Sequence, residues 1–442
     1  MIHPLIQLVK DQKNGKKKGI TSVCSANKFV LEAAMINAKQ YDEYVLIEAT
    51  ANQVNQYGGY TGMTPKDFTS FALEIAKEQS FDLDKLILGG DHLGPLTWTN
   101  EKEEIAMEKA KELIKGYVLA GFTKIHIDTS MKLADDDKNI RLSDEVIAQR
   151  GAELCAVAEQ TFSEMKTKNI NAMAPVYVVG SEVPIPGGTQ EEEEEGISVT
   201  SVDDFKKTVE VFKKHYEAKG LTKAWERVVA VVVQPGVEFG DASVDEYNRD
   251  KAKDLIKALE DYPSLVFEGH STDYQTPKKL RQMVKDSIAI LKVGPGLTFA
   301  LREALFALAD IEEELLALRP IKLSNFKSVL EDEMLKNPGN WEKHYHGEAG
   351  ELIFKRKFSF SDRCRYYFPA EDVDNAIKAL IKNLMGVDIP LTLLSQYMPV
   401  QYTKVKAGII DNNPLSLIHD RINNCMDEYA FGCGRDRREG QN

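Results

Sequence analysis

Eight short apolar runs in the first two thirds of the chain dominate its pattern of hydrophobic and polar positions. They are GITSVCSA (19–26), YVLIEA (44–49), LILGGDH (86–92), KIHIDTS (124–130), APVYVVGSEV (174–183), RVVAVVVQPG (227–236), SLVFEGHS (264–271) and IAILKVGPG (288–296). Several are continuous rather than alternating, which is typical of parallel strands covered on both faces. Since helical patterns separate the runs, the sequence predicts an α/β protein with a (β/α)8 TIM barrel. An open, doubly wound sheet is the alternative.

The clearest helical pattern between two of these runs covers residues 101–121. One face of this segment carries only apolar side chains, namely Ala106, Ala110, Leu113, Ile114, Tyr117 and Val118. Gly121 follows at the position where a helix commonly ends. Residues 206–220 and 251–262 show the same type of pattern.

Beyond residue 297 the strand-like runs give way to helical segments. Residues 297–318 predict a strong helix, and later segments are interrupted at 337–341, 359–369 and 387–399. We therefore expect the barrel to occupy residues 1–297 and a helical C-terminal extension, packed on the barrel, to occupy residues 298–442. The glutamate-rich segment 188–196 is expected to be a solvated loop.

Polar residues gather at the carboxyl end of nearly every predicted strand, which is where (β/α)8 barrels carry their active sites. The candidate catalytic carboxylates are Asp91, Asp128 and Glu182. His92 and His270 follow strands on opposite sides of the predicted ring, where two imidazoles with nearby acids suit a divalent metal. A structural role for the two histidines is an equal alternative at this point.

Three further segments are candidates for substrate binding. The loop EATANQVNQYGGYTG (48–62) crowds Glu48, Asn52, Gln53 and Asn55 together, and such amides suit the hydroxyl groups of a sugar. The ends of the last two strands offer glycines, hydroxyls and a helix N-terminus suited to phosphate. Residues 361–369 contain an arginine pair that also suits phosphate, although ordinary surface or packing roles are an alternative there. The candidates outside the loop are Ser25, Ser271, Asp273, Lys292, Gly294, Gly296, Arg363 and Arg365.

The amino-acid composition limits the kinds of binding partner and the cellular compartment that are expected for the chain. The chain has 442 residues, a net charge of −13 and a pI of about 5.3, so a nucleic-acid or anionic-membrane partner is not expected. Its five scattered cysteines show no disulfide or zinc-finger spacing. Without a signal-like N-terminus or a long apolar run, the chain is expected to be cytoplasmic.

Taken together, these motifs resemble the GatZ/KbaZ family, which is associated with class II D-tagatose-1,6-bisphosphate aldolase. The resemblance rests on IEATANQVNQYGGYTGMTP (47–65), LGGDHLGP (88–95), VVVQPGVEF (231–239), EGHSTDYQT (268–276), LKVGPGLTFALREA (291–304), SDRCRYYFP (361–369) and GVDIPLTLLSQYMP (386–399). It implies a class II aldolase-like barrel in which Asp91 carries a proton and His92 and His270 bind a divalent metal, Zn²⁺ or Mn²⁺. Gln234 stands where catalytic class II aldolases have a third metal histidine, and it is the candidate third ligand.

The resemblance implies carbohydrate metabolism and leaves three functions open. The chain is expected to be a component of the aldolase, paired with a smaller class II subunit of the GatY/KbaY type and acting on ketohexose phosphates. It is alternatively an autonomous, metal-dependent C4-epimerase of fructose and tagatose or their 6-phosphates, or a non-catalytic scaffold that binds sugar phosphates. A kinase activity, also attributed to this family, is not expected because no GxxxxGK[ST] motif occurs. Self-association into a homo-oligomer is a further expectation.

Overall fold

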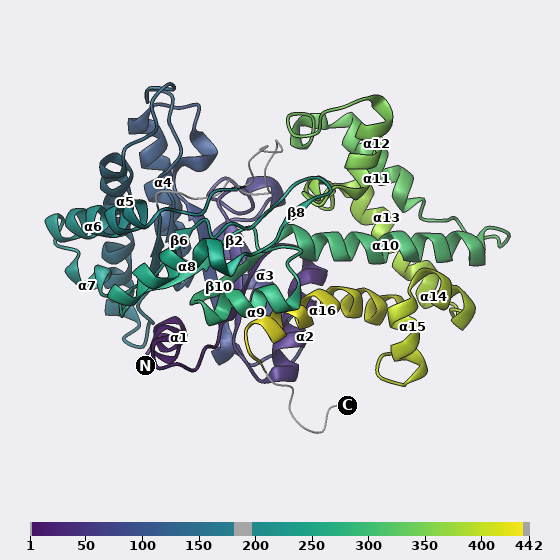
Figure 1. The fold of residues 1–442 in the computed structure, drawn as a ribbon. Helices are drawn as coiled ribbons and strands as arrows, with labels where there is room; N and C mark the ends of the chain where they lie inside the picture. The colour runs from purple at the N-terminus through teal and green to yellow at the C-terminus, as the bar shows by residue number, and fades with distance from the viewer. Residues whose placement is uncertain (1, 181–196, 436–442) are drawn as a thin grey trace.

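Eight parallel strands form a closed barrel in the purple-to-teal half of the molecule (Figure 1). The structure, a computed structural model, describes residues 2–180 and 197–435. The barrel strands are β1 (Ile20–Cys24), β2 (Val45–Thr50), β3 (Leu86–Leu93), β4 (Lys124–Ile127), β5 (Val176–Val179), β6 (Val228–Val233), β9 (Val266–Gly269) and β10 (Ile288–Val293). Neighbouring strands in the sequence pair with each other, and β10 pairs with β1 to close the ring. The predicted fold class is confirmed, because each of the eight predicted runs overlaps one barrel strand.

The interior of the barrel is apolar at one end and charged at the other. Helix α1 (Pro4–Lys13) covers the amino-terminal end, where Leu5 and Val9 pack against inward-facing strand residues such as Leu46. The buried His3 caps this helix, since its Nδ1 accepts a hydrogen bond from the Leu5 N–H at 3.1 Å. Because alternate strand residues face inward, the next inward layer begins two residues later on each strand. That layer is charged and fully or almost fully buried, and it includes Glu48, Lys124, Glu268 and Lys292.

Helices cover the outside of the barrel as predicted. They are α2 (Lys28–Tyr41), α3 (Pro65–Glu78), α4 (Glu103–Leu119), α5 (Asp144–Lys168), α6 (Val202–Ala218), the short α7 (Thr222–Trp225), α8 (Arg249–Ala258) and α9 (Pro277–Lys285). The apolar face predicted for residues 101–121 is the buried face of α4. Gly121 follows that helix with a φ of +94°, a conformation that favours glycine. A small hairpin, β7 (Glu238–Phe239) and β8 (Val244–Asp245), follows β6.

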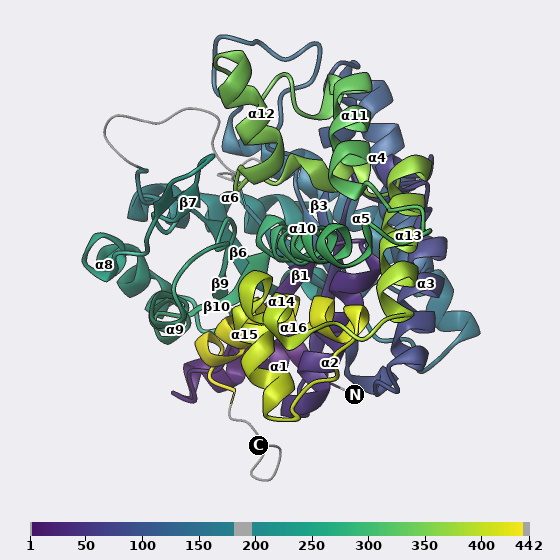
Figure 2. The same cartoon turned by 90° about the vertical axis from the view of Figure 1, so that its right-hand side faces the viewer.

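The helical extension lies beside the barrel, coloured green to yellow (Figure 1). Its helices are α10 (Pro295–Leu316), α11 (Phe326–Lys336), α12 (Ala349–Phe358), α13 (Glu371–Met385), α14 (Leu391–Tyr397), α15 (Pro399–Lys406) and α16 (Pro414–Gly432). Helix α10 starts directly after β10 and is surrounded by α11, α13, α14 and α16 (Figure 2). The predicted boundary between residues 297 and 298 therefore falls in the first turn of α10.

The last of these helices returns to the barrel. Helix α16 packs against α9 on one side and α2 on the other, so it fills the gap in the outer ring that α10 leaves when it extends away. The N–H of Gly19, just before β1, donates to the carbonyl oxygen of Cys433 at 2.9 Å. The extension is consequently part of the barrel's own packing.

A buried ion pair fixes the loop between α12 and α13. The Arg302 guanidinium on α10 lies 3.6 Å from Oδ1 of Asp362, and the Thr298 hydroxyl donates to Oδ2 of Asp362 at 2.5 Å. Arg302 also stacks 4.1 Å from the ring centroid of Phe299. These contacts place the following residues of the loop over the barrel. Among the residues that the structure describes, no helix has the length and apolar character required to cross a membrane.

Candidate active site

A pocket opens at the carboxyl ends of the barrel strands. Strands β1, β2, β3, β9 and β10, with the loops that follow them, supply most of its wall. The extension supplies Arg365 and Tyr366, and Tyr366 makes an edge-to-face contact with Tyr60 at a centroid distance of 4.8 Å. The lining residues are Cys24, Thr50, Asn52, Gln53, Tyr60, Asp91, His92, Phe239, His270, Ser271, Asp273, Lys292, Gly294, Pro295, Arg365 and Tyr366.

A β-bulge on β3 brings two adjacent residues into this site. Gly90 pairs with Ile125 and Leu93 pairs with Ile127, so β3 holds one more residue than β4 between the two pairs. In a regular strand Asp91 and His92 would face opposite sides, but the bulge lets both side chains reach the site. His92 has a φ of +47°, in the left-handed region that non-glycine residues rarely occupy. Strain of this kind is typical of positions where function determines the backbone.

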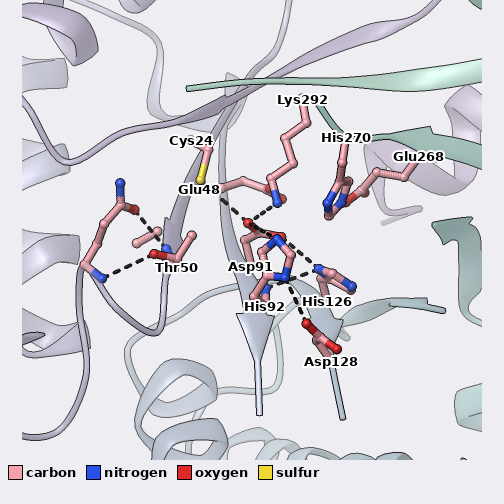
Figure 3. A network of polar contacts seen from close by, with 12 residues as sticks. Cys24, Glu48, Thr50, Asp91, His92, His126, Asp128, Glu268, His270 and Lys292 are labelled. Atoms are coloured by element: carbon pink, nitrogen blue, oxygen red, sulfur yellow. Dashed lines mark hydrogen bonds and ion pairs between the residues drawn. The ribbon is translucent and has the colours of Figure 1, made fainter. Parts of the chain in front are cut away.

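Three buried imidazoles lie around one point (Figure 3). The ring centroids of His92, His126 and His270 are 5.1, 5.0 and 5.3 Å apart in pairs. An imidazole nitrogen lies about 2.1 Å from a bound metal ion, and the centroid of its ring lies about 1.1 Å further out. At tetrahedral angles, the ring centroids of three imidazoles on one ion would therefore lie about 5.2 Å from one another. The near-equilateral arrangement therefore matches three ligands of a single tetrahedral ion.

Carboxylates hold two of the imidazoles by one ring nitrogen and leave the other nitrogen available. Nδ1 of His92 lies 2.9 Å from Oδ2 of Asp128, and Nε2 of His270 lies 3.0 Å from Oε1 of Glu268. Burial alone would raise the pKa of Asp128, but its hydrogen bond with His92 and the nearby imidazoles hold that pKa well below the ordinary value. A carboxylate behind each ligating histidine is a recurring feature of protein metal sites.

His126 has one ring nitrogen available for a cation. Its Nδ1 lies 3.2 Å from the backbone nitrogen of His92 and 2.8 Å from Oδ1 of Asp91. The neutral tautomer with its proton on Nδ1 donates to the Asp91 carboxylate and leaves the lone pair of Nε2 available. Nε2 of His126 is buried and has no hydrogen-bond partner among the described residues. These features fit a cation-binding centre.

The charges around the imidazoles also fit a divalent ion. Lys124 pairs with Glu48 at 2.5 Å and with Glu268 at 2.8 Å. Lys292 pairs with Asp91, whose other oxygen contacts His126 (Figure 3). Four carboxylates, including Asp128, and two ammonium groups leave two negative charges uncompensated when the imidazoles are neutral.

Burial favours the neutral, metal-binding form of two of the imidazoles. Burial lowers the pKa of His126 to about 4 and that of His270 to about 3. Burial alone would lower the pKa of Lys124, but the carboxylates of Glu268 and Glu48 raise it above its ordinary value. The residues present therefore fit a bound Zn²⁺ or Mn²⁺.

The structure does not bring Gln234 into the cluster. Its Oε1 accepts the N–H groups of Gly236 at 2.8 Å and Val237 at 3.0 Å, so its oxygen serves the turn after β6. The remaining amide NH₂ is a donor and cannot bind a cation. His126 on β4 supplies the third imidazole instead. The expectation that Gln234 is the third ligand is therefore corrected, because its oxygen already accepts two backbone N–H groups.

The other predicted residues divide into three groups. Asn52, Gln53, Ser271, Asp273, Lys292, Gly294 and Arg365 line the pocket together with Asp91, His92 and His270. Ser25 lines an adjoining cavity of about 890 Å³, which shares Cys24, Gln53, Tyr60 and Arg365 with the first pocket. Glu48 lies beneath the pocket floor, and Glu182 lies outside the described residues.

Two predicted binding residues have structural contacts away from the pocket. The Asn55 amide donates to the Ala51 carbonyl, and its Oδ1 accepts the N–H groups of Tyr57 and Gly59, so Asn55 shapes its own loop. Arg363 donates to the carbonyl oxygen of Asn340 at 3.1 Å within the extension. The predicted arginine pair is thus divided, because only Arg365 reaches the pocket.

The predicted phosphate site after β10 is already filled by a carboxylate. Oδ1 of Asp273 accepts the N–H groups of Gly294 at 3.0 Å and Gly296 at 2.7 Å. These are the amides that the glycine pattern offered to a phosphate. Burial raises the pKa of Asp273 to about 6, although the two amides oppose this shift.

Sequence reasoning missed His126, Lys124 and the tyrosine pair of Tyr60 and Tyr366. For β4 a signal was present in KIHID, because Ile125 and Ile127 face the helices and the alternation turns Lys124, His126 and Asp128 inward. For the tyrosine pair no local signal exists, because the contact joins segments that are far apart in the sequence.

Comparison with known proteins assigns the chain to a family. Residues 5–434 match the family of GatZ/KbaZ-like D-tagatose-1,6-bisphosphate aldolase subunits. The chain belongs to this family. A crystal structure of a probable tagatose 6-phosphate kinase from Sinorhizobium meliloti is 43% identical and covers 94% of this chain and 100% of its own, with a TM-score of 0.85.

Two other solved structures are much more distant from this GatZ/KbaZ-like chain. Fructuronate-tagaturonate epimerase UxaE from Cohnella laeviribosi is 11% identical, covers 95% of this chain and 82% of its own, and has a TM-score of 0.46. The YdjI aldolase from Escherichia coli is 11% identical, covers 86% of this chain and 97% of its own, and has a TM-score of 0.40. At these values neither carries an argument about activity.

Proposed function

We propose that this chain carries out aldol-type chemistry on a ketohexose or its phosphate in its own barrel, as a component of a class II D-tagatose-1,6-bisphosphate aldolase. The observation that carries the proposal is the trio of His92, His126 and His270 beside the buried carboxylate of Asp91. A barrel that served only as a scaffold would not need three buried imidazoles and an acid whose ligand atoms lie within 4.8 Å of one another. The smaller class II aldolase subunit is the proposed protein partner.

In the proposed site each group has a separate task. The imidazoles of His92, His126 and His270 would hold a divalent metal, which would supply Lewis-acid chemistry next to the ketose carbonyl. Asp91 takes the proton of the C4 hydroxyl as the C3–C4 bond breaks, and the bonding electrons pass to the C2 carbonyl oxygen. The products are an aldehyde from C4 to C6 and an enediolate from C1 to C3.

Lys292 and the sugar-binding side chains support this step. Lys292 pairs with Asp91, so its ammonium group lies beside the carboxylate that accepts the proton. Burial lowers the pKa of Lys292, so its ammonium group gives up a proton more readily than that of an exposed lysine. Gln53 and Asn52 present amides to the sugar hydroxyls at the pocket wall.

A second function, C4-epimerisation of a ketohexose or its 6-phosphate, uses the same first step. The aldehyde would turn its other face to the enediolate, the C3–C4 bond would re-form, and Asp91 would return its proton to the C4 oxygen. The contact between Tyr60 and Tyr366 favours this candidate, since it joins the loop after β2 to the extension at the pocket wall. A pocket wall closed in this way would retain the aldehyde until it rotates and presents its other face to the enediolate.

One experiment distinguishes the two functions. The purified chain is supplied with Zn²⁺ or Mn²⁺ and given tagatose 1,6-bisphosphate, tagatose 6-phosphate or fructose 6-phosphate, with and without the smaller subunit. Triose phosphates indicate the aldolase, and interconversion of tagatose and fructose forms indicates the epimerase. The Asp91→Asn variant, purified in parallel, reports any contaminating activity. If neither reaction occurs under any condition, the proposal of aldol chemistry is wrong.

A further inference from the structure

The amides at the start of α10 form an anion site that the protein itself occupies. The N–H groups of Gly294 and Gly296 converge on Oδ1 of Asp273 at 3.0 and 2.7 Å. They lie at the N-terminus of a helix of 22 residues, where the helix dipole also favours a negative group. A Cβ atom on Gly296 would lie 3.1 Å from the same oxygen, so the carboxylate sits tightly against the backbone.

The turn that carries Asp273 is held in place from both sides. It follows β9, and Ser271 and Tyr274 in this turn have φ values of +51° and +64°. The Thr272 hydroxyl donates to the carbonyl oxygen of Lys292 at 2.5 Å, which ties the turn to β10. The Tyr429 hydroxyl of α16 donates to the carbonyl oxygen of Thr272 at 2.8 Å. Because these contacts are buried, the carboxylate is a built part of the pocket wall.

The cations that line the pocket are already engaged. Lys292 pairs with Asp91. Arg365 donates to the Asp362 carbonyl oxygen at 2.9 Å and to the Tyr366 hydroxyl at 3.1 Å, and its charge also acts on Asp273. A phosphate entering at α10 would therefore meet the Asp273 carboxylate instead of free amides. A sugar hydroxyl, in contrast, donates readily to a carboxylate oxygen.

We propose that Asp273 is a specificity residue that reserves the α10 end of the pocket for the uncharged hydroxyl end of a ketose and excludes a phosphate from the amides of Gly294 and Gly296. The inference rests on the proposed function, because it takes a ketose as the ligand. Of the two proposed reactions, it favours C4-epimerisation of a ketohexose or its 6-phosphate over cleavage of tagatose 1,6-bisphosphate. A bisphosphate would place a second charged group at the α10 end of the pocket.

Phosphate binding by variants of the full chain tests the inference. Isothermal titration calorimetry measures the affinity of the metal-loaded protein for inorganic phosphate. Asp273→Ala frees the amides and removes the charge, so phosphate should bind at least tenfold more tightly than to the unaltered chain. Asp273→Asn removes the charge but keeps an acceptor on the amides, so the gain should be smaller, about threefold. Asp261→Ala removes an exposed carboxylate from the surface and should leave the affinity unchanged.

The outcomes separate this inference from the proposed function. Binding is measured without turnover, so an inactive chain whose phosphate affinity rises in Asp273→Ala supports the inference even though it argues against aldol chemistry. An unchanged affinity in a folded Asp273→Ala variant with normal metal content overturns the inference. If that variant does not fold, an unchanged affinity in Asp273→Asn overturns it. A crystal structure of the unaltered chain with phosphate on the Gly294 and Gly296 amides would do the same.

Discussion

Replacing His126 provides the sharpest test of the metal centre, because the sequence pointed to a different residue. His126→Asn removes the imidazole but keeps an oxygen close to the position of Nδ1, which lies 3.2 Å from the backbone nitrogen of His92. The fold should therefore survive the substitution. The matched control is Gln234→Ala, which removes a side chain whose oxygen is committed to two backbone amides.

The size of the effect follows from the geometry of the cluster. In the proposed centre, three imidazoles with centroids 5.0 to 5.3 Å apart would share one ion, and the variant leaves only His92 and His270 in place. Loss of a residue that merely orients a ligand costs about 10- to 100-fold in metal affinity, so loss of a ligand should cost at least about 100-fold. That factor corresponds to about 2.7 kcal/mol.

The assay is a competition titration of Zn²⁺ between the protein and a chromophoric chelator, with metal content measured after dialysis. Thermal unfolding of the EDTA-treated proteins shows whether each variant is folded. We expect His126→Asn to lose its stoichiometric metal and Gln234→Ala to keep it with an affinity within about threefold of the unaltered chain. The reverse pattern, with metal retained without His126 and lost without Gln234, would refute the three-histidine centre.

Three further predictions concern the proton carrier, the residue behind a ligand and an acid-sensitive helix cap. The Asp91→Asn variant should retain its metal, but its rate of C–C cleavage should fall by about 10²- to 10⁴-fold. The rate is measured as the release of triose phosphate or the formation of the epimer, and an unchanged rate would exclude Asp91 as the base. Asp128→Asn, which alters the carboxylate behind His92, should weaken Zn²⁺ binding by about 10- to 100-fold, whereas Asp261→Asn at the surface should not. Burial lowers the pKa of His3 to about 4 in the folded chain. Between about pH 6.5 and 4, His3 is therefore protonated in the unfolded chain but not in the folded chain. The free energy of unfolding consequently falls as the pH falls through this range. The His3→Asn variant keeps a side chain that can cap the helix but does not titrate in this range. Between pH 6 and 5 its free energy of unfolding, measured with urea, should fall by about 1.4 kcal/mol per pH unit less than that of the unaltered chain. If the free energies of unfolding of the two proteins depend equally on pH, His3 is not the titrating group.

The barrel was predictable because its cause lies in the local sequence. Each strand is a short apolar run, and each run is followed by polar residues at the end where active sites form. Asp91 and His92 stood out for the same reason, since they follow an apolar run and are framed by glycines. The bulge that turns both side chains into the site is a property of pairing with β4 and was not visible in the run itself.

The proposed metal ligands were only partly predictable because they come from three different strands. His126 lies between two isoleucines and was counted as part of the apolar run, although alternation alone turns it inward with Asp128. Gln234 was assigned by the resemblance to class II aldolases, and only the hydrogen bonds of its turn remove it from the set of candidate ligands. Similarly, the glycines after β10 suggested a phosphate site until the structure placed Asp273 on their amides.

The position of α16 has a consequence for how the protein is made. All eight barrel strands leave the ribosome before the extension, yet the helix that fills the gap between α9 and α2 is encoded after it. Until α16 arrives, the outer surfaces of α9 and α2 are exposed, and such unfinished apolar surfaces promote aggregation of nascent chains. The barrel therefore completes its packing only late in synthesis. Before α16 is made, the nascent chain exposes apolar surfaces of the kind that chaperones bind.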